Sequence, residues 1–233
     1  MLSRLLTGAL LAGAAAGLVA AVLQLVLLQP LLIEAEAYEI ASIPAAGGEA
    51  HGHGATEIAA GIDLARNGLT ILFSILIYAG YALILTALMA LAESRGHAVT
   101  ARAGLLWGAA GFVAVQLAPA VSLGVALPGG AAADIAMRQV WWIACVAATG
   151  LGLWCLAFGA SARAWGAAIV LVLGPHLIGA PQPESYWSAA PAELASVFAP
   201  RALGIGLFAW MVTGALAGYL RTRSETAAET RAA

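Results

Sequence analysis

Long apolar runs with almost no charge constrain this sequence more than any other feature. Six of them cover approximately residues 5–28, 69–92, 103–123, 139–158, 164–180 and 201–220. An α-helix needs about 20 residues, within a range of about 17–25, to cross the hydrocarbon core of a bilayer. Charged residues make up 9% of the chain, against about 25% in a soluble domain, so too few remain to cover a water-facing surface. The sequence predicts one all-α transmembrane helical bundle over residues 1–223. About six spans are expected, or five if the short stretch 164–180 does not cross.

The arginines predict how this bundle is oriented. With six spans and the N-terminus in the cytoplasm, seven of the ten basic residues face the cytoplasm and three face the outside. This asymmetry follows the positive-inside rule, so both termini are expected to be cytoplasmic. The first apolar run also exceeds the 7–15-residue core of a signal peptide, and we expect it to remain as a span. The inner set is Arg4, Arg95, Arg102, Arg163, Arg221, Arg223 and Arg231, and the outer set is Arg66, Arg138 and Arg201.

The segments between the spans are expected to be short, with one exception. Residues 34–68 form an outer loop that is acidic at its start and contains glycine and histidine further on. Residues 224–233 form a polar tail, which we expect to be disordered because it contains little apolar surface to bury. Paired glycines four residues apart favour close helix crossings inside the bundle. These pairs are Gly13–Gly17, Gly104–Gly108 and Gly214–Gly218.

Three groups of residues are candidate ligands for a divalent metal ion. Imidazole suits transition metals and carboxylate suits harder ions. The first group is His51 and His53 in the outer loop, which could equally be part of a solvated linker. The second is Glu34, Glu36 and Glu39 at the outer end of the first span, which could also be ordinary interfacial residues. The third is His176, an ionisable residue near the outer end of an apolar segment, beside a helix break expected at Gly174-Pro175. Such a residue is a functional-site hypothesis by default, with a structural hydrogen bond as the alternative.

A polar stripe runs along the second apolar segment. Its members recur at spacings of three and four residues, which places them on one helix face. Such a face can line a pathway or bond to neighbouring helices, and the second role is the safer interpretation. The stripe consists of Asn67, Thr70, Ser74, Tyr78 and Tyr81, and Gln24, Gln116 and Thr149 are further polar residues within spans.

Other function classes find no support in the sequence. The net charge of −2 and the absence of a basic tail argue against nucleic-acid binding. The sequence contains no GxxxxGK[ST], HExxH or GxSxG motif, so neither ATP hydrolysis of the Walker type nor an enzyme is expected.

Several runs, taken together, resemble the CbtA family, whose members are predicted cobalt-transporter subunits. The resemblance covers nearly the whole chain in the right order, and the run from Pro175 to Pro183 is its most specific part. The other runs are Leu31-Leu32-Ile33-Glu34-Ala35-Glu36-x-Tyr38-Glu39, Arg102-x-Gly104-Leu105-Leu106-Trp107-Gly108, Leu117-Ala118-Pro119-Ala120 and Arg138-Gln139-x-Trp141-Trp142.

The resemblance implies a multi-pass protein of the bacterial cytoplasmic membrane that takes up cobalt in connection with cobalamin synthesis. It also implies a small partner, CbtB, with one span and a His-rich end. No permanently bound cofactor is expected, and the transported ion would be Co²⁺ or Ni²⁺. Cobalt follows from the resemblance alone, because nitrogen and oxygen sites bind Ni²⁺ more tightly than Co²⁺.

Two functional hypotheses follow. In the first, the chain is the membrane subunit of a divalent-metal uptake transporter. Its outer acids and histidines concentrate the ion, and Glu34, Glu36 and His176 form the mouth of a path. In the second, the chain is a non-transporting scaffold or regulatory subunit, and its histidines are structural.

Overall fold

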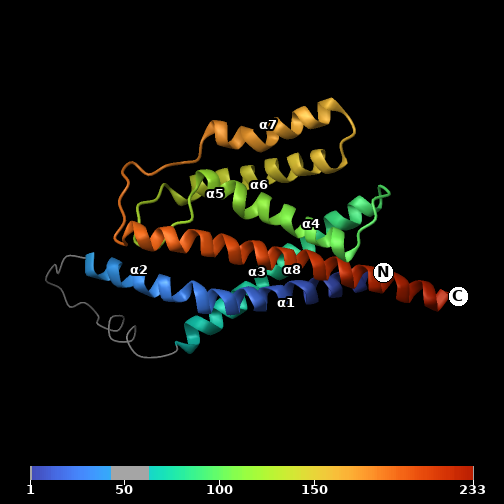
Figure 1. Ribbon diagram of the computed structural model, residues 1–233, viewed down its shortest axis with the longest axis horizontal. Coiled ribbons are helices and arrows are strands. Elements are labelled where there is room, and N and C mark those ends of the chain that lie inside the picture. The colour runs from blue at the N-terminus through green and yellow to red at the C-terminus, as the bar shows by residue number, and fades with distance from the viewer. Residues whose placement is uncertain (1, 43–62, 233) are drawn as a thin grey trace.

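Helices make up most of the part of the chain that the structure describes, and this part contains no β-strand. The computed structural model describes the backbone of residues 2–42 and 63–232, and the side chains of residues 3–42 and 63–223. The helices follow one another along a single elongated bundle (Figure 1). They are α1 (Leu2–Leu27), α2 (Gln29–Ser42), α3 (Leu64–Glu93), α4 (Ala101–Phe112), the π-helical turn η1 (Val113–Leu117), α5 (Ala118–Ser122), α6 (Ile135–Phe158), α7 (Ala162–Ile178) and α8 (Ala192–Ala232).

Five helical segments in this described part are long and apolar enough to cross a membrane. They are Ser3–Leu27, Leu64–Glu93, Ala101–Ser122, Ile135–Phe158 and Ala192–Arg223. Large apolar side chains point outward along them, such as Phe73, Ile143 and Val121, which are more than half exposed. Outward-facing apolar surface is what lipid requires, so the expectation of a helical membrane bundle is confirmed.

The sixth apolar segment forms α7, which is shorter than the others. Its 17 residues span about 25 Å at 1.5 Å per residue, slightly less than the hydrocarbon thickness of about 30 Å. It runs antiparallel beside α6, so the chain returns to the end of the bundle at which α6 begins (Figure 1). The helix break expected at Gly174-Pro175 was misplaced. α7 continues through Pro175 and ends before Gly179, whose φ of 88° is a conformation that glycine adopts without steric penalty.

The segments outside the spans also differ from those that the sequence predicts. After a break at Leu28, helix resumes as α2, so residues 34–42 of the expected outer loop are helical, as are residues 64–68 at the start of α3. Residues 43–62 of that loop lie outside the described part. At the other terminus α8 is helical to Ala232, whereas the sequence led us to expect a disordered tail.

The glycine pairs are positions of close backbone contact, as predicted. A Cβ added at Gly13 or Gly17 would collide with the backbone of α3 around Ala79 or Ile75. A Cβ at Gly108 would collide with the carbonyl of Trp210 on α8, and Gly104 and Gly214 face each other's backbones in the same crossing. The bundle is therefore built from two tight crossings, α1 on α3 and α4 on α8, with α1 also packed on α8 and with α6 and α7 as a more peripheral pair.

The two chain termini lie at the same end of the bundle (Figure 1). We call this the cytoplasmic end, following the arginine distribution, and the opposite end the outer end. At the cytoplasmic end, the Arg221 Nε donates to the Glu93 carboxylate at 2.6 Å and joins α8 to α3. At the outer end, α2, the start of α3, the α5–α6 connection and the start of α8 come together.

Candidate functional site

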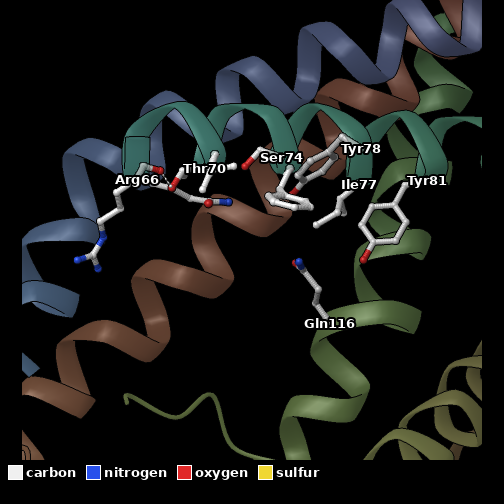
Figure 2. Close-up of a pocket in the computed structure, with 10 residues that line it drawn as sticks. Arg66, Thr70, Ser74, Ile77, Tyr78, Tyr81 and Gln116 are labelled. Carbon is white, nitrogen blue, oxygen red and sulfur yellow. Dashed lines mark hydrogen bonds between the residues drawn. The ribbon is translucent and has the colours of Figure 1, made fainter. Parts of the chain in front are cut away.

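A polar cavity lies in the outer half of the bundle, between α3 and the π-turn η1. Its volume is about 550 Å³, and Figure 2 shows its lining residues. Three apolar side chains on its rim, Leu69, Phe73 and Ile77, are about half exposed, so the cavity is open toward the side of the bundle. The polar lining residues are Gln24 from α1, Arg66, Thr70, Ser74, Tyr78 and Tyr81 from α3, and Gln116 from η1.

The stripe predicted on one face of α3 supplies most of this lining. Thr70, Ser74, Tyr78 and Tyr81 all reach this laterally open cavity, so the stripe does more than contact another helix. Asn67 instead bonds to a neighbouring helix, which was the safer interpretation of the stripe. Its Oδ1 accepts a hydrogen bond from Gln29 Nε2 at 2.8 Å and joins α3 to α2.

Arg66, which lines the outer end of the cavity, forms an ion pair with Glu36 of α2, and Glu36 itself is not a lining residue. Arg66 Nη1 and Nη2 donate to the two carboxylate oxygens of Glu36 at 2.8 and 2.6 Å. This two-bond geometry is the strong, orientation-fixing form of an arginine–carboxylate contact. Asp63 caps α3 by accepting from the Arg66 amide at 2.9 Å, which fixes the turn that carries Arg66. Both side chains of the pair remain about one-third exposed, so an ion from the aqueous phase can reach them.

The opposite wall of the cavity comes from a π-turn. The Ala118 amide donates to the Val113 carbonyl, five residues back, and Pro119 follows. Proline has no amide hydrogen for the Val115 carbonyl, which favours the wider turn. Such π-bulges occur frequently at functional sites. Here the turn carries Gln116, which extends toward α3 (Figure 2). Its Oε1 is buried without a hydrogen-bond partner among the described residues. Gly206 of α8 provides the space for the Gln116 side chain, because a Cβ at Gly206 would collide with this oxygen.

Aromatic rings close the cavity toward the cytoplasmic end. Tyr81 stacks on Trp210 with a centroid separation of 4.5 Å, and Tyr78 meets Tyr81 edge-to-face at 5.7 Å. Below them, Leu85 and Met89 of α3 are packed into an apolar cluster. The cavity therefore does not continue to the cytoplasmic end of the bundle in this conformation.

The predicted acidic ligands on α2 point to different places. Glu36 binds Arg66, Glu34 is exposed, and the side chain of Glu39 lies against Gly129 in the α5–α6 connection. The described residues contain no group of three or more His, Cys, Asp or Glu side chains placed to hold a metal. His51 and His53 lie outside the described residues.

His176 lies in a different part of the bundle from these acids. Its Nδ1 and the Ser122 hydroxyl are 2.9 Å apart, and its ring meets Trp141 edge-to-face at 6.1 Å. Trp141 Nε1 also donates to the carbonyl of Pro175. These contacts join α7 to α5 and α6, and α7 makes no close contact with α2 or α3. The structure does not bring His176 together with Glu34 and Glu36.

A comparison with known protein families identifies the family of this chain. A family model described as "Probable cobalt transporter subunit (CbtA)" matches residues 2–222. The chain belongs to the CbtA family. Searches of curated proteins and of solved structures give no match.

The CbtA match includes every residue of the cavity and of the ion pair at its mouth. Membership implies a probable cobalt transporter subunit, a membrane protein that works with other subunits. Arg66 was expected only as an outer arginine and not as a site residue. The available signal was its position four residues before Thr70, which continues the spacing of the stripe.

Proposed function

We propose that this CbtA protein is the membrane subunit through which a divalent transition metal, cobalt in the first instance, enters a bacterial cell across the cytoplasmic membrane. One observation carries the proposal: a laterally open cavity in an apolar bundle is lined by seven polar residues, and one of them, Arg66, binds the Glu36 carboxylate. Polar groups inside a membrane are expensive and line substrate or ion pathways.

The first step is attraction of the cation to the outer end. Glu34, Glu36 and Glu39 carry negative charge there, and His51 and His53 belong to the adjoining segment. Clustered charge of one sign raises the local concentration of counter-ions. Glu36 is the residue that receives the metal, because it alone among the three binds a residue that lines the cavity, Arg66. The ion has to replace Arg66 there, which makes the Glu36–Arg66 pair the selective step between outside and cavity.

Within the cavity the ion meets neutral oxygen atoms. Hydroxyl groups come from Thr70, Ser74 and Tyr78, and an amide oxygen comes from Gln116. These donors can replace a few water molecules but do not neutralise a double charge, so the ion moves partly hydrated, and the volume of about 550 Å³ leaves room for that water. A membrane potential of 100 mV contributes about 4.6 kcal/mol to inward movement of a 2+ ion, twice the single-charge value. Passage further inward requires the Tyr81–Trp210 contact to open.

The lateral opening of the cavity supports the proposal that a partner subunit packs beside it. Backbone and side-chain polar groups are not left facing hydrocarbon without compensation. A small single-span subunit with histidines, of the CbtB kind, would cover the opening beside Phe73 and Ile77. Its imidazoles would add the nitrogen ligands that the cavity lining lacks. Of the candidate ligands, His176 would then contribute to the outer surface rather than to the path.

Uptake of ⁵⁷Co²⁺ and ⁶³Ni²⁺ tests the proposal in a bacterial strain without its own importers, with and without the partner subunit. The transport proposal predicts partner-dependent accumulation driven by the membrane potential. A matched measurement uses liposomes that contain the purified protein alone or both subunits. If neither preparation moves Co²⁺ while the protein still binds its partner, the chain is a scaffold or regulatory subunit instead.

A further inference from the structure

A second cavity, unrelated to the polar one, opens at the cytoplasmic end of the bundle. It lies between α3 and α6, with α4 as its floor, and has a volume of about 550 Å³. Small residues such as Ala103, Ala110 and Gly150 form much of its surface, and Leu106, which is 74% exposed, stands at its edge. We refer to it as the α3–α6 groove. An apolar groove open to the side of a membrane bundle is filled by lipid or by another helix.

The length of the groove distinguishes these two occupants. Along α4 and the start of η1 it extends from Ala103 to Ala114, about 16 Å of helix, and on α6 from Gly150 to Phe158, about 12 Å. Both lengths correspond to about half of the hydrocarbon thickness of about 30 Å. A spanning helix would require a contact surface along the whole thickness. The groove therefore matches the acyl chains of one leaflet, the cytoplasmic one.

The cytoplasmic mouth of the groove is aromatic and cationic. The Arg95 guanidinium lies over the ring of Trp154 at 5.4 Å, and His97 packs on Phe158 at 4.6 Å. Arg95 and His97 are both exposed. The nearby acid, Glu93, is engaged by Arg221 of α8. The mouth therefore presents positive charge at the depth where lipid phosphates lie, and aromatic rings favour the same interface.

We propose that the α3–α6 groove binds a phospholipid of the cytoplasmic leaflet that carries a net negative charge. Its acyl chains fill the groove along Ala103, Ala110 and Gly150, and its phosphate binds Arg95 and His97. Basic pockets between transmembrane helices on the cytoplasmic side are known to bind anionic headgroups. The site is independent of the metal path, because none of its residues lines the polar cavity.

Native mass spectrometry of the purified full-length protein in detergent tests this site. The protein is titrated with phosphatidylglycerol and with phosphatidylcholine of identical acyl chains. The wild type is expected to retain phosphatidylglycerol in preference to phosphatidylcholine. Arg95→Gln is expected to reduce this preference roughly fivefold, the contribution of one arginine near an anionic lipid surface, while phosphatidylcholine binding stays unchanged. Gly150→Leu is expected to reduce binding of both lipids, because the new side chain occupies the groove.

Two matched variants act as controls. Arg163→Gln removes another exposed cytoplasmic arginine, and Gly166→Leu adds the same side chain to an open glycine of α7 outside the groove. Both are expected to bind lipid as the wild type does. Equal retention of the two lipids by the wild type, or an Arg95→Gln profile identical to that of Arg163→Gln, overturns the proposal. Lipid binding by Gly150→Leu that equals that of Gly166→Leu overturns it as well, because the acyl chains would then not lie in the groove.

Discussion

Arg66 binds both carboxylate oxygens of Glu36 at the outer mouth of the cavity, at 2.8 and 2.6 Å. The pair joins α3 to α2, and Arg66 places it beside the cavity that this arginine helps to line. A cation that binds Glu36 must displace Arg66. Substitutions of the two partners are therefore expected to act in opposite directions on metal affinity, whereas a purely structural pair would lose function in the same way from either side.

Glu36→Gln removes the charge that receives the metal but keeps the size of the side chain. We expect the apparent KM for Co²⁺ uptake to rise about tenfold, which corresponds to about 1.4 kcal/mol of lost binding. Initial uptake rates over a range of Co²⁺ concentrations measure it. Glu34→Gln serves as the control, because Glu34 carries the same charge on α2 but is exposed and is not part of the ion pair. Equal effects in the two variants would show that only the general negative charge of α2 matters.

Arg66→Gln leaves Glu36 without its cationic partner. An ion pair with this exposure contributes up to about 1 kcal/mol, so the apparent KM for Co²⁺ is expected to fall by up to about fivefold. The same uptake assay measures the change, and Arg138→Gln, another outer-end arginine, is the control for loss of positive charge. A KM that rises in Arg66→Gln would mean that the arginine positions Glu36 for the metal instead of competing with it.

Gln116→Met tests the inner part of the path. The buried Oε1 of Gln116 has no hydrogen-bond partner among the described residues, and an unsatisfied buried polar group costs about 1–3 kcal/mol. Replacement by an apolar side chain of similar length is therefore expected to keep or raise the thermal stability in detergent while lowering the maximal uptake rate severalfold. Unchanged transport in a stable Gln116→Met protein would exclude this amide from the path.

Much of the bundle could be predicted because lipid imposes a simple pattern on sequence. Apolar runs of bilayer length predicted the helices, and the glycine pairs predicted the crossings at Gly13 and Gly108. The spacing of Thr70, Ser74 and Tyr78 predicted a polar face, although not whether it would enclose a cavity. That depended on the π-turn around Gln116, which adds one residue to the helical turn. Pro119 favours such a turn, but a proline alone does not specify one.

Whether Glu34, Glu36 and His176 come together at the mouth of a path could not be predicted from sequence, because this depends on packing between distant helices. Glu36 and His176 both fall at the outer end, and sequence gives no lateral distance between them. The structure places α7 against α5 and α6, away from α2. The outer loop was predicted too long for a local reason. The polar residues after Ile33 were interpreted as the end of a helix, whereas helix resumes at Gln29 and continues to Ser42.

Gly108→Ala tests the tight α4–α8 crossing. A methyl group there collides with the Trp210 carbonyl and the backbone of Met211, so the helices must move apart. Overpacking of this kind typically costs about 1–3 kcal/mol. We expect a lower midpoint of thermal unfolding in detergent and less monodisperse protein. Gly80→Ala is the control, because a Cβ at Gly80 meets nothing within 4 Å. Equal midpoints for the two variants would contradict the close contact.

His176→Ala separates a structural histidine from a metal ligand. The ring is held by the Ser122 hydroxyl at 2.9 Å and by the edge of Trp141, both within the α5–α6–α7 part of the bundle. Loss of one such hydrogen bond is expected to lower the free energy of unfolding by about 1 kcal/mol. Co²⁺ uptake per folded molecule should stay close to that of the wild type. Uptake normalised to the amount of folded protein in the membrane measures this, and Ser122→Ala is the matched control because it breaks the same hydrogen bond and keeps the imidazole. If His176→Ala abolishes uptake while Ser122→Ala does not, the imidazole itself binds the metal, and the path must include the outer end of α7.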